Sequence, residues 1–323
     1  MTTSTSIPIA AFKDVYDVSA VDRALSDLAP GSSEVLKSTY EKMLETGGRR
    51  FSVKPSGAQA LDELYDELPN FAEVLDDIRK HIALCSSSSD PMELPPMLLL
   101  GEPGIGKTHF CRRIARLLTT GYGFASMSSM TAGWILSGAS SQWKNAKPGK
   151  VFDTLLYGSY ANPVIVVDEI DKAGGETQYD PLGALYSLLE RDTACEFVDE
   201  FVEVPVDASG VVWIATANEE SRIPEPILNR MNTYSIQAPD RDGSRKVAQA
   251  IYTEIRSSHD WGKSFAEAPT APALDRLAEM GPREMRRALM YAFGSAKLAH
   301  GDEIQVDDIE GTRAPKKKQR IGF

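Results

Sequence analysis

A glycine-rich segment at residues 101–108 carries the clearest chemistry in this sequence. Gly101, Gly106, Lys107 and Thr108 satisfy the pattern G-x-x-x-x-G-K-[ST], in which glycines let backbone N–H groups close around a phosphate. The lysine of this pattern reaches the β- and γ-phosphates of a nucleotide such as ATP, and the following hydroxyl ligates Mg²⁺. The residues that we expect to contact the nucleotide are Gly101, Glu102, Pro103, Gly104, Ile105, Gly106, Lys107, Thr108 and His109.

The segments on either side of this loop predict the strand and the helix that a phosphate loop requires. Residues 97–100 are a short apolar run, which is typical of a buried parallel strand. After Thr108, Phe110, Ile114 and Leu117 recur at helical spacing. The predicted helix would place the positive end of its dipole, about half a unit charge, at the bound phosphate.

Two carboxylates follow another apolar run further along the chain. Residues 164–167 are all β-branched, and Asp168 and Glu169 come directly after them. Because ligands of α/β sheets bind at the carboxyl ends of the strands, we expect both acids near the phosphate loop. Asp168 would hold Mg²⁺ through water, and Glu169 would polarise the attacking water. Taken alone, the run is also compatible with a strand that merely ends in acids.

Further polar residues follow at strand and helix ends. The apolar run 211–215 ends at Thr216-Ala217-Asn218, and an amide between the two catalytic strands can bond the γ-phosphate or the attacking water. The prolines of residues 223–230 fix the backbone and aim Arg230 outward. Residues 241–300 have a helical pattern throughout. The sequence therefore predicts an α/β fold, with a parallel sheet flanked by helices and followed by a small all-α domain.

Composition narrows the class of protein. A chain of 323 residues is long for one compact domain, so we expect about two or three units. The net charge of −11 disfavours nucleic-acid binding through overall charge. The three cysteines have no metal-ligand spacing and fit a reducing cytosol. No apolar run approaches the roughly 18 residues of a membrane span, so we expect a soluble cytoplasmic protein without membrane partners.

The order and spacing of these segments resemble those of an AAA+ ATPase and, more narrowly, of the ATPase module of Lon proteases. The likeness covers about residues 66–300, and its blocks are Asp168-Glu-Ile-Asp-Lys172, Asp180-Pro181, residues 201–207, Ala215-Thr-Ala-Asn218 and Pro226-Ile-Leu-Asn-Arg-Met231. The resemblance implies that Lys107 and Thr108 are the Walker A pair and that Asp168 and Glu169 are the Walker B pair. It also implies that Asn218 is sensor 1, that Arg283 is sensor 2, and that Arg230 is an arginine finger acting on the ATP of a neighbouring subunit. Between Asn218 and Ile223 this chain has one residue more than Lon proteases usually have, so Arg222 is a second candidate for the contact with the neighbouring subunit.

The same resemblance implies a pore loop before Pro148-Gly149. Trp143 falls on the aromatic position of that loop, and Lys144 departs from its usual apolar second residue. An exposed tryptophan can grip an unfolded chain without regard to sequence, whereas the alternative is a ring tucked under its own loop. Tyr179 is a weaker candidate for the same pore.

The predicted domains are an N-terminal mostly helical segment at residues 1–65, a large nucleotide-binding domain at 66–238, a helical lid at 239–311 and a basic tail at 312–323. The sequence ends about where the proteolytic domain of Lon would begin, so we expect no peptidase activity. Residues 316–320 either touch nucleic acid or form a solvated end. The terminal Ile-Gly-Phe resembles the loop by which some AAA+ unfoldases dock into peptidases, and the alternative is a frayed end without function.

These features together favour an ATP-hydrolysing protein remodeller that works as a ring, with hexamers expected from the family. Its partners would be further copies of itself, a protein substrate, and a separate peptidase or adaptor. Two alternatives stay open at this point, a DNA-associated AAA+ motor or loader and a regulatory switch that binds ATP with little turnover. Salt-sensitive duplex binding would favour the motor, and tight ATP binding with little hydrolysis would favour the switch.

Overall fold

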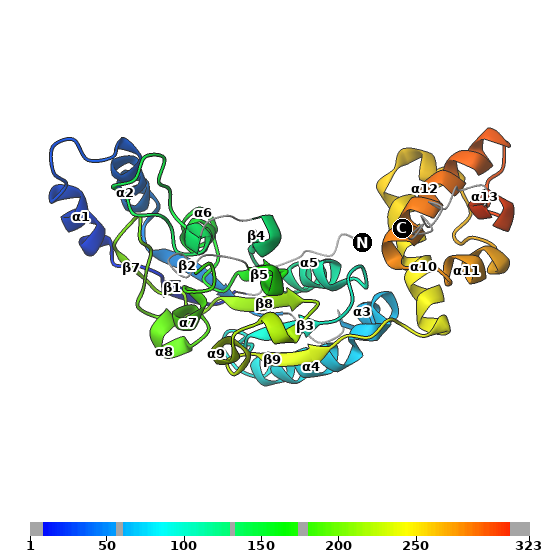
Figure 1. Cartoon of the computed structure of the whole chain (residues 1–323), viewed down its shortest axis with the longest axis horizontal. Coiled ribbons are helices and arrows are strands. Elements are labelled where there is room, and N and C mark those ends of the chain that lie inside the picture. The colour runs from blue at the N-terminus through cyan, green and yellow to red at the C-terminus, as the bar shows by residue number, and fades with distance from the viewer. Residues whose placement is uncertain (1–8, 56–60, 130–132, 174–179, 311–323) are drawn as a thin grey trace, which may run out of the picture. The chain divides into compact units, whose positions relative to one another are not determined.

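The computed structural model describes residues 9–55, 61–129, 133–173 and 180–310, and it divides into two compact units (Figure 1). Unit 1 consists of Met1–Leu61, Glu73–Gly101 and Lys107–Ile236, and unit 2 of Asp62–Ala72, Glu102–Gly106 and Gln237–Phe323. Tyr179 and the tail at 312–323 lie outside the described residues. The predicted domain boundaries at residues 65, 238 and 311 stay predictions.

The central sheet of unit 1 has five parallel strands in the order β4-β5-β8-β3-β9. The strands are β4 (Tyr122–Ser126), β5 (Val164–Asp168), β8 (Val212–Ala217), β3 (Met97–Leu100) and β9 (Asn232–Ser235). Leu100 pairs with Ala217, and Val167 pairs with Ala215. β8 therefore lies between the strand that leads into the phosphate loop and the strand that ends in Asp168, as the sequence predicted.

Some elements differ from the sequence-based expectation. The sequence predicts a strand at residues 124–130, but β4 ends at Ser126 and is followed by a helical turn at Met127–Ser129. The apolar pattern of residues 182–189 predicts a helix, but α7 covers only Leu185–Leu188. Of the strand that the sequence predicts at 201–206, only β7 (Pro205–Val206) forms, and it pairs with β6 (Phe197–Val198) outside that range. β9 was not predicted, because only Tyr234 of its four residues is buried and the segment has no apolar run.

Helices flank the sheet of unit 1. In Figure 1, α4 and α5 lie on opposite sides of the central strands. The helices of this part are α4 (Ala72–Ser86), α5 (Lys107–Leu117), α6 (Lys150–Tyr157), α7, α8 (Arg191–Ala194) and α9 (Glu225–Leu228), with single 3₁₀ turns at Gly133–Ile135, Ile170–Lys172 and Glu220–Arg222. The first turn of α5 directly follows the phosphate loop, which is the placement that anion binding at a helix N-terminus requires.

The N-terminal segment packs onto the same core. It forms β1 (Ile9–Asp14), α1 (Val18–Ser26), α2 (Glu34–Thr46) and β2 (Arg49–Val53), and β1 pairs with β2 in an antiparallel ribbon. Serine is a residue type that favours helix N-caps, and Ser33 caps α2 by accepting from the N–H of Leu36. The sequence did not predict β1. Arg50 is 3% exposed and donates to the carbonyls of Leu155 and Leu156 in the last turn of α6. These bonds join the N-terminal segment to the large α/β body, since they satisfy helix-end carbonyls that lack partners within the helix.

Unit 2 is helical. Its helices are α3 (Asp62–Glu67), α10 (Arg241–Ser258), α11 (Ala271–Leu277), α12 (Pro282–Leu298) and α13 (Val306–Glu310), with 3₁₀ turns at Pro69–Phe71 and Asp260–Ser264. Asp240 caps α10 by accepting from the N–H of Gly243 at 2.7 Å. The stacked rings of Tyr252 and Phe293, 5.0 Å apart, join α10 to α12 in the core. No helix among the described residues is both long enough and apolar enough to span a bilayer.

Candidate functional site

Lys107 lies at the start of α5 with its ammonium drawn toward the end of β8. Its side chain is 8% exposed, and Nζ donates to the carbonyl of Gly101 at 2.5 Å and to Oδ1 of Asn218 at 3.0 Å. The phosphate-loop lysine and the predicted sensor 1 residue are therefore in direct contact. A phosphate oxygen arriving here would take over part of this hydrogen bonding to Nζ, because an ammonium has only three donors.

Asp168 is the centre of a second set of contacts at the same edge of the sheet. Its Oδ1 accepts from the hydroxyl of Thr108 at 3.1 Å and from the hydroxyl of Thr216 at 2.7 Å. Its Oδ2 has no partner among the described residues, so one carboxylate oxygen is available next to a hydroxyl. Mg²⁺ prefers oxygen ligands and keeps several waters, so Thr108 and Asp168 fit this ion. No cluster of three or more acidic, histidine or cysteine ligands exists among the described residues, and phosphate oxygens would complete the site.

Glu169 has an unusual backbone conformation. Its φ of 56° and ψ of 48° lie in the left-handed region, which is uncommon for a residue other than glycine. The N–H of Glu169 donates to Thr216 Oγ1 at 3.0 Å, and its carbonyl accepts from the N–H of Lys172 at 2.8 Å. These two bonds hold the backbone in a strained state, and such strain is concentrated at functional sites.

In unit 2, the phosphate-loop residues 102–106 lie against the segment that precedes α4. Asn70 donates to the carbonyls of Ile105 and Gln237 at 3.4 and 3.1 Å. Gly104 has a φ of 92°, and a methyl group built at its Cα would lie 3.9 Å from Cδ of Arg283. Arg283, at the start of α12, is exposed and has no hydrogen-bond or ion-pair partner among the described residues. The aliphatic part of the predicted sensor 2 side chain thus lies beside Gly104 of the phosphate loop.

The two candidate arginine fingers are held by other acids. The Nε of Arg222 lies 2.6 Å from Glu219 Oε2, on a side chain that is 56% exposed. The Nε of Arg230 lies 2.5 Å from Glu190 Oε1, and its Nη1 donates to the carbonyl of Pro226 at 2.6 Å. Neither guanidinium contacts Lys107, Thr108 or Asp168 within the chain.

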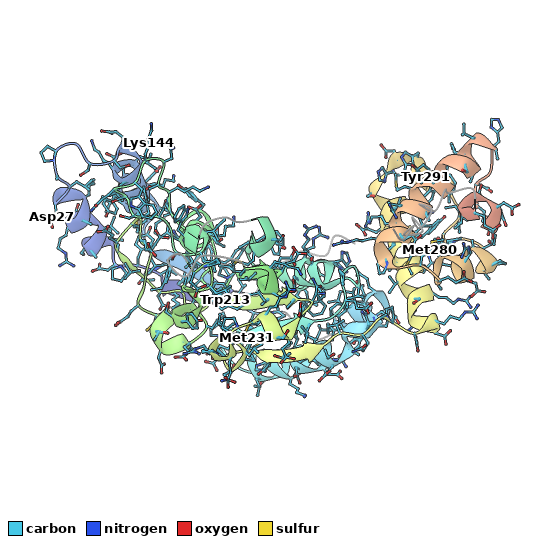
Figure 2. All side chains as sticks on the ribbon, viewed as in Figure 1. Asp27, Lys144, Trp213, Met231, Met280 and Tyr291 are labelled. Atoms are coloured by element: carbon cyan, nitrogen blue, oxygen red, sulfur yellow. The ribbon has the colours of Figure 1, made fainter. Side chains whose placement is uncertain are left out.

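The loop that carries Trp143 is exposed at its tip and built on a second tryptophan. Trp143 is 45% exposed and meets Trp134 edge to face, with ring centroids 5.1 Å apart. Lys144 is exposed and lies at the rim of unit 1 in Figure 2. The ring is therefore supported from one side and open to solvent on the other, rather than tucked under its own loop.

Asp199 bonds to one end of this loop and lies close against the other. The buried carboxylate accepts from the N–H groups of Gly149, Phe201 and Val202 at 2.8, 3.0 and 3.3 Å. At the other end, a methyl group at Gly138, whose φ is 80°, would lie 2.4 Å from Asp199 Oδ1. Burial raises the pKa of Asp199 to about 6, because desolvation outweighs the three N–H bonds that favour the charged form. The base of the loop thus depends on one buried acid.

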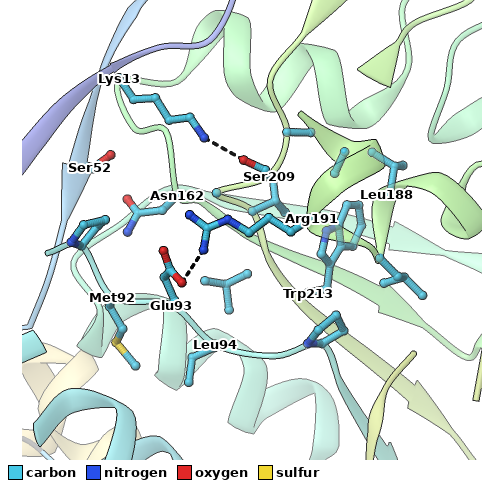
Figure 3. A pocket seen from close by; sticks show the side chains of 18 residues that line it. Lys13, Ser52, Met92, Glu93, Leu94, Asn162, Leu188, Arg191, Ser209 and Trp213 are labelled. Atoms are coloured by element: carbon cyan, nitrogen blue, oxygen red, sulfur yellow. Dashed lines mark hydrogen bonds and ion pairs between the residues drawn. The ribbon is translucent and has the colours of Figure 1, made fainter. Parts of the chain in front are cut away.

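A cavity of about 310 Å³ lies at the opposite, amino-terminal ends of the central strands (Figure 3). Its lining includes Pro96, Asn162 and Trp213, which stand just before or at the start of β3, β5 and β8. Two ion pairs border it, Arg191 with Glu93 and Lys13 with Asp207. None of the predicted site residues lines this cavity, which therefore lies apart from the cluster at the carboxyl edge.

Sequence reasoning missed several of these residues. Thr216 was noted as part of a strand end but not as the group that contacts both Asp168 and Glu169. A hydroxyl in an otherwise apolar buried strand was the available signal. Asp199 and Glu190 had no such signal, because their partners lie far away along the chain. Cys111, in α5, is fully buried, and burial raises the pKa of its thiol, so it stays protonated and unreactive.

A five-stranded parallel sheet with a phosphate loop after β3, acids after β5 and an amide after β8 defines a P-loop ATPase of the AAA+ class. The family described as "ATPase family associated with various cellular activities (AAA)" matches residues 97–237. Two solved structures support the fold. The chain superposes on the Thermotoga maritima RuvB Holliday junction branch migration motor with a TM-score of 0.51 and 14% identity, covering 80% of this chain and 71% of that one. It superposes on the S. cerevisiae Hsp104:casein complex with a TM-score of 0.57 and 16% identity, covering 74% of this chain and 47% of that one.

Within this class the chain is related to Lon proteases and resembles their ATPase module. It is 28% identical to a mitochondrial Lon protease homolog of Emericella nidulans over 96% of its own length, and 32% identical to that of Aspergillus niger over 92%. A Lon protease of Clostridium beijerinckii is 30% identical over 88% of the chain. The chain spans only 29%, 28% and 38% of the lengths of these three relatives. The likeness therefore concerns an AAA+ module and not the whole activity of a Lon protease.

Proposed function

We propose that this chain hydrolyses ATP with Mg²⁺ at the carboxyl edge of β3, β5 and β8. The observation that carries the proposal is the pair of contact sets in which Lys107 meets Asn218 and Thr108 meets Asp168. Lys107 would bind the β- and γ-phosphates, and Glu169 would orient the attacking water. Mg²⁺, when bound by Thr108 and Asp168, supplies positive charge to the phosphate oxygens.

Two substitutions test this proposal. Lys107→Ala removes the phosphate-binding ammonium, so nucleotide binding and hydrolysis are both expected to fall. Glu169→Gln keeps the shape of the side chain but removes the base, so ATP is expected to bind and remain unhydrolysed. Calorimetry with a non-hydrolysable ATP analogue and a phosphate-release assay measure the two steps. Wild-type protein that shows no heat of binding at micromolar concentration contradicts the proposal.

We further propose that the active form is a ring in which Arg230 completes the ATP site of a neighbouring subunit. Arg230 is not used at the phosphate cluster of its own subunit, which agrees with action on a neighbour. An arginine finger contributes about 10³- to 10⁵-fold in rate, so hydrolysis per subunit should rise with protein concentration. A rate that depends on neither concentration nor Arg230→Ala would contradict this assembly. Tight binding with hydrolysis near zero at high concentration would instead indicate a regulatory switch.

The ring is proposed to remodel a protein substrate through the loop around Trp143. Its support is the exposed ring of Trp143 on a base fastened by Asp199. Trp143→Ala is expected to retain ATPase activity and to lose unfolding of a model substrate, whereas Lys144→Ala should have a smaller effect. If Trp143→Ala unfolds the substrate as fast as the wild type, the loop does not grip the chain.

A further inference from the structure

Glu190 lies between two buried leucines and the start of α8. Leu188 and Leu189 belong to the core of unit 1, and Glu190 itself is the residue before α8. Its carbonyl accepts from the N–H of Ala194 at 2.9 Å and from the hydroxyl of Thr193 at 3.2 Å. The backbone of Glu190 is therefore held in place from both directions.

The residue that follows Glu190 adds a further anchor. Arg191 forms an ion pair with Glu93, which belongs to the segment between α4 and β3 (Figure 3). Core packing on one side and this ion pair on the other give Glu190 a defined position from which its carboxylate reaches Arg230. A fixed position matters because a long arginine side chain otherwise carries about 2 kcal/mol of rotamer entropy.

The guanidinium of Arg230 faces Glu190 along one edge. Its Nε is shielded from solvent and forms an ion pair with Glu190 Oε1, 2.5 Å away, without the alignment of a hydrogen bond. Its Nη1 donates to the carbonyl of Pro226 in α9. Its Nη2 has no partner among the described residues, and the side chain is 27% exposed. The contacts thus define the plane of the guanidinium and leave one terminal nitrogen for another molecule.

We propose that Glu190 is the positioning residue for Arg230, holding the Nε edge so that Nη2 can bind the γ-phosphate on a neighbouring subunit. This inference rests on the proposed function, in which Arg230 acts on that neighbour. The opposite role would be restraint, with Glu190 competing against the phosphate for the same cation. The two roles differ in sign, because loss of the carboxylate lowers hydrolysis if it positions Arg230 and raises hydrolysis if it restrains it.

The first test is the ATPase rate of Glu190→Ala at a protein concentration that saturates the wild-type rate. Because the partly shielded ion pair with Glu190 fixes the guanidinium, and small displacements of a catalytic group are costly, we expect the rate to fall roughly 10- to 100-fold, with unchanged ATP affinity. Glu190→Gln keeps an oxygen acceptor but loses the charge, so its ATPase rate should lie between the rates of the wild type and of Glu190→Ala. Glu196→Ala is the matched control, since this exposed acid lies nearby in the sequence and its side chain makes no hydrogen bond or ion pair among the described residues.

A mixing experiment separates positioning in trans from damage to the subunit's own site. Glu169→Gln subunits cannot hydrolyse ATP but carry an intact Arg230, whereas Glu190→Ala subunits have an intact Glu169. Mixed rings of the two should recover hydrolysis, because each Glu190→Ala site next to a Glu169→Gln subunit receives a correctly positioned arginine. Recovery together with an unaffected Glu196→Ala control supports the inference.

Several results would overturn it. A Glu190→Ala rate equal to or above the wild-type rate excludes positioning, and a low rate that mixing does not restore indicates a defect within the subunit. The mixture of Arg230→Ala with Glu169→Gln is the reference. If that mixture recovers and the Glu190→Ala mixture does not, the inference fails while the proposed function stands. If Arg230→Ala alone is fully active, both the positioning role of Glu190 and the proposed action of Arg230 on a neighbouring subunit fail.

Discussion

Thr216→Val removes one hydroxyl from the middle of the nucleotide cluster while keeping the shape of the side chain. In the wild type this hydroxyl donates to Asp168 Oδ1 at 2.7 Å and accepts from the N–H of Glu169 at 3.0 Å. Because Thr216 is 1% exposed, water cannot take the place of the hydroxyl. The substitution therefore tests whether this contact holds the metal ligand and the catalytic acid in register.

The expected loss of free energy in Thr216→Val follows from the two hydrogen bonds that the substitution removes. A hydrogen bond to a charged group contributes about 1.5–3 kcal/mol, and an unpaired buried N–H costs about 1–3 kcal/mol. Asp168 keeps its bond from Thr108, so we expect the lower part of the combined range, about 3 kcal/mol. If about half of this loss is felt in the transition state, hydrolysis falls roughly tenfold, since about 1.4 kcal/mol corresponds to a factor of ten.

The assay is single-turnover hydrolysis of ATP at saturating protein, with ATP affinity measured in parallel. Thr216→Ser is the matched control, because it keeps the hydroxyl and loses a buried methyl, which costs about 1 kcal/mol of stability. Thr216→Ser should hydrolyse ATP near the wild-type rate, and Thr216→Val should not. A Thr216→Val rate within twofold of the wild type, or a Thr216→Ser variant equally slow, would refute the reasoning.

Three further predictions concern the folded chain. The pKa of Asp199, raised to about 6 from 3.8, makes its contribution to stability greatest at low pH and lost as pH rises through about 6. The wild type should therefore gain thermal stability over Asp199→Asn between pH 7 and pH 5, by at most about 1.4 kcal/mol per pH unit, and parallel melting curves would contradict this. Gly138→Ala combines a φ of 80° with a Cβ 2.4 Å from Asp199 Oδ1, so it should cost about 1–3 kcal/mol or more and speed proteolysis of the Trp143 loop. Gly294→Ala in α12 meets open space, so it should raise the melting temperature of unit 2 through a gain of about 0.5–1 kcal/mol.

Much of the large unit followed from local patterns. Apolar runs marked β3, β5 and β8, and the glycines before Lys107 marked the turn into α5. The sequence analysis also placed the strand that ends at Asn218 between the two catalytic strands, where β8 lies between β5 and β3. Less regular segments were harder, and β9 and β1 were missed because a half-exposed edge strand shows no continuous apolar run.

The sequence by itself determined which residues could bind a nucleotide, because the phosphate loop, Asp168 and Asn218 each stand at the end of a run whose local pattern encodes a strand. Only the tertiary structure decided what holds these groups. Thr216 joins Asp168 to Glu169, Asp199 fastens the Trp143 loop, and Glu190 pairs with Arg230. The physical reason is that a strand or turn depends on neighbours a few residues away, whereas a hydrogen bond between distant segments depends on how the whole chain packs.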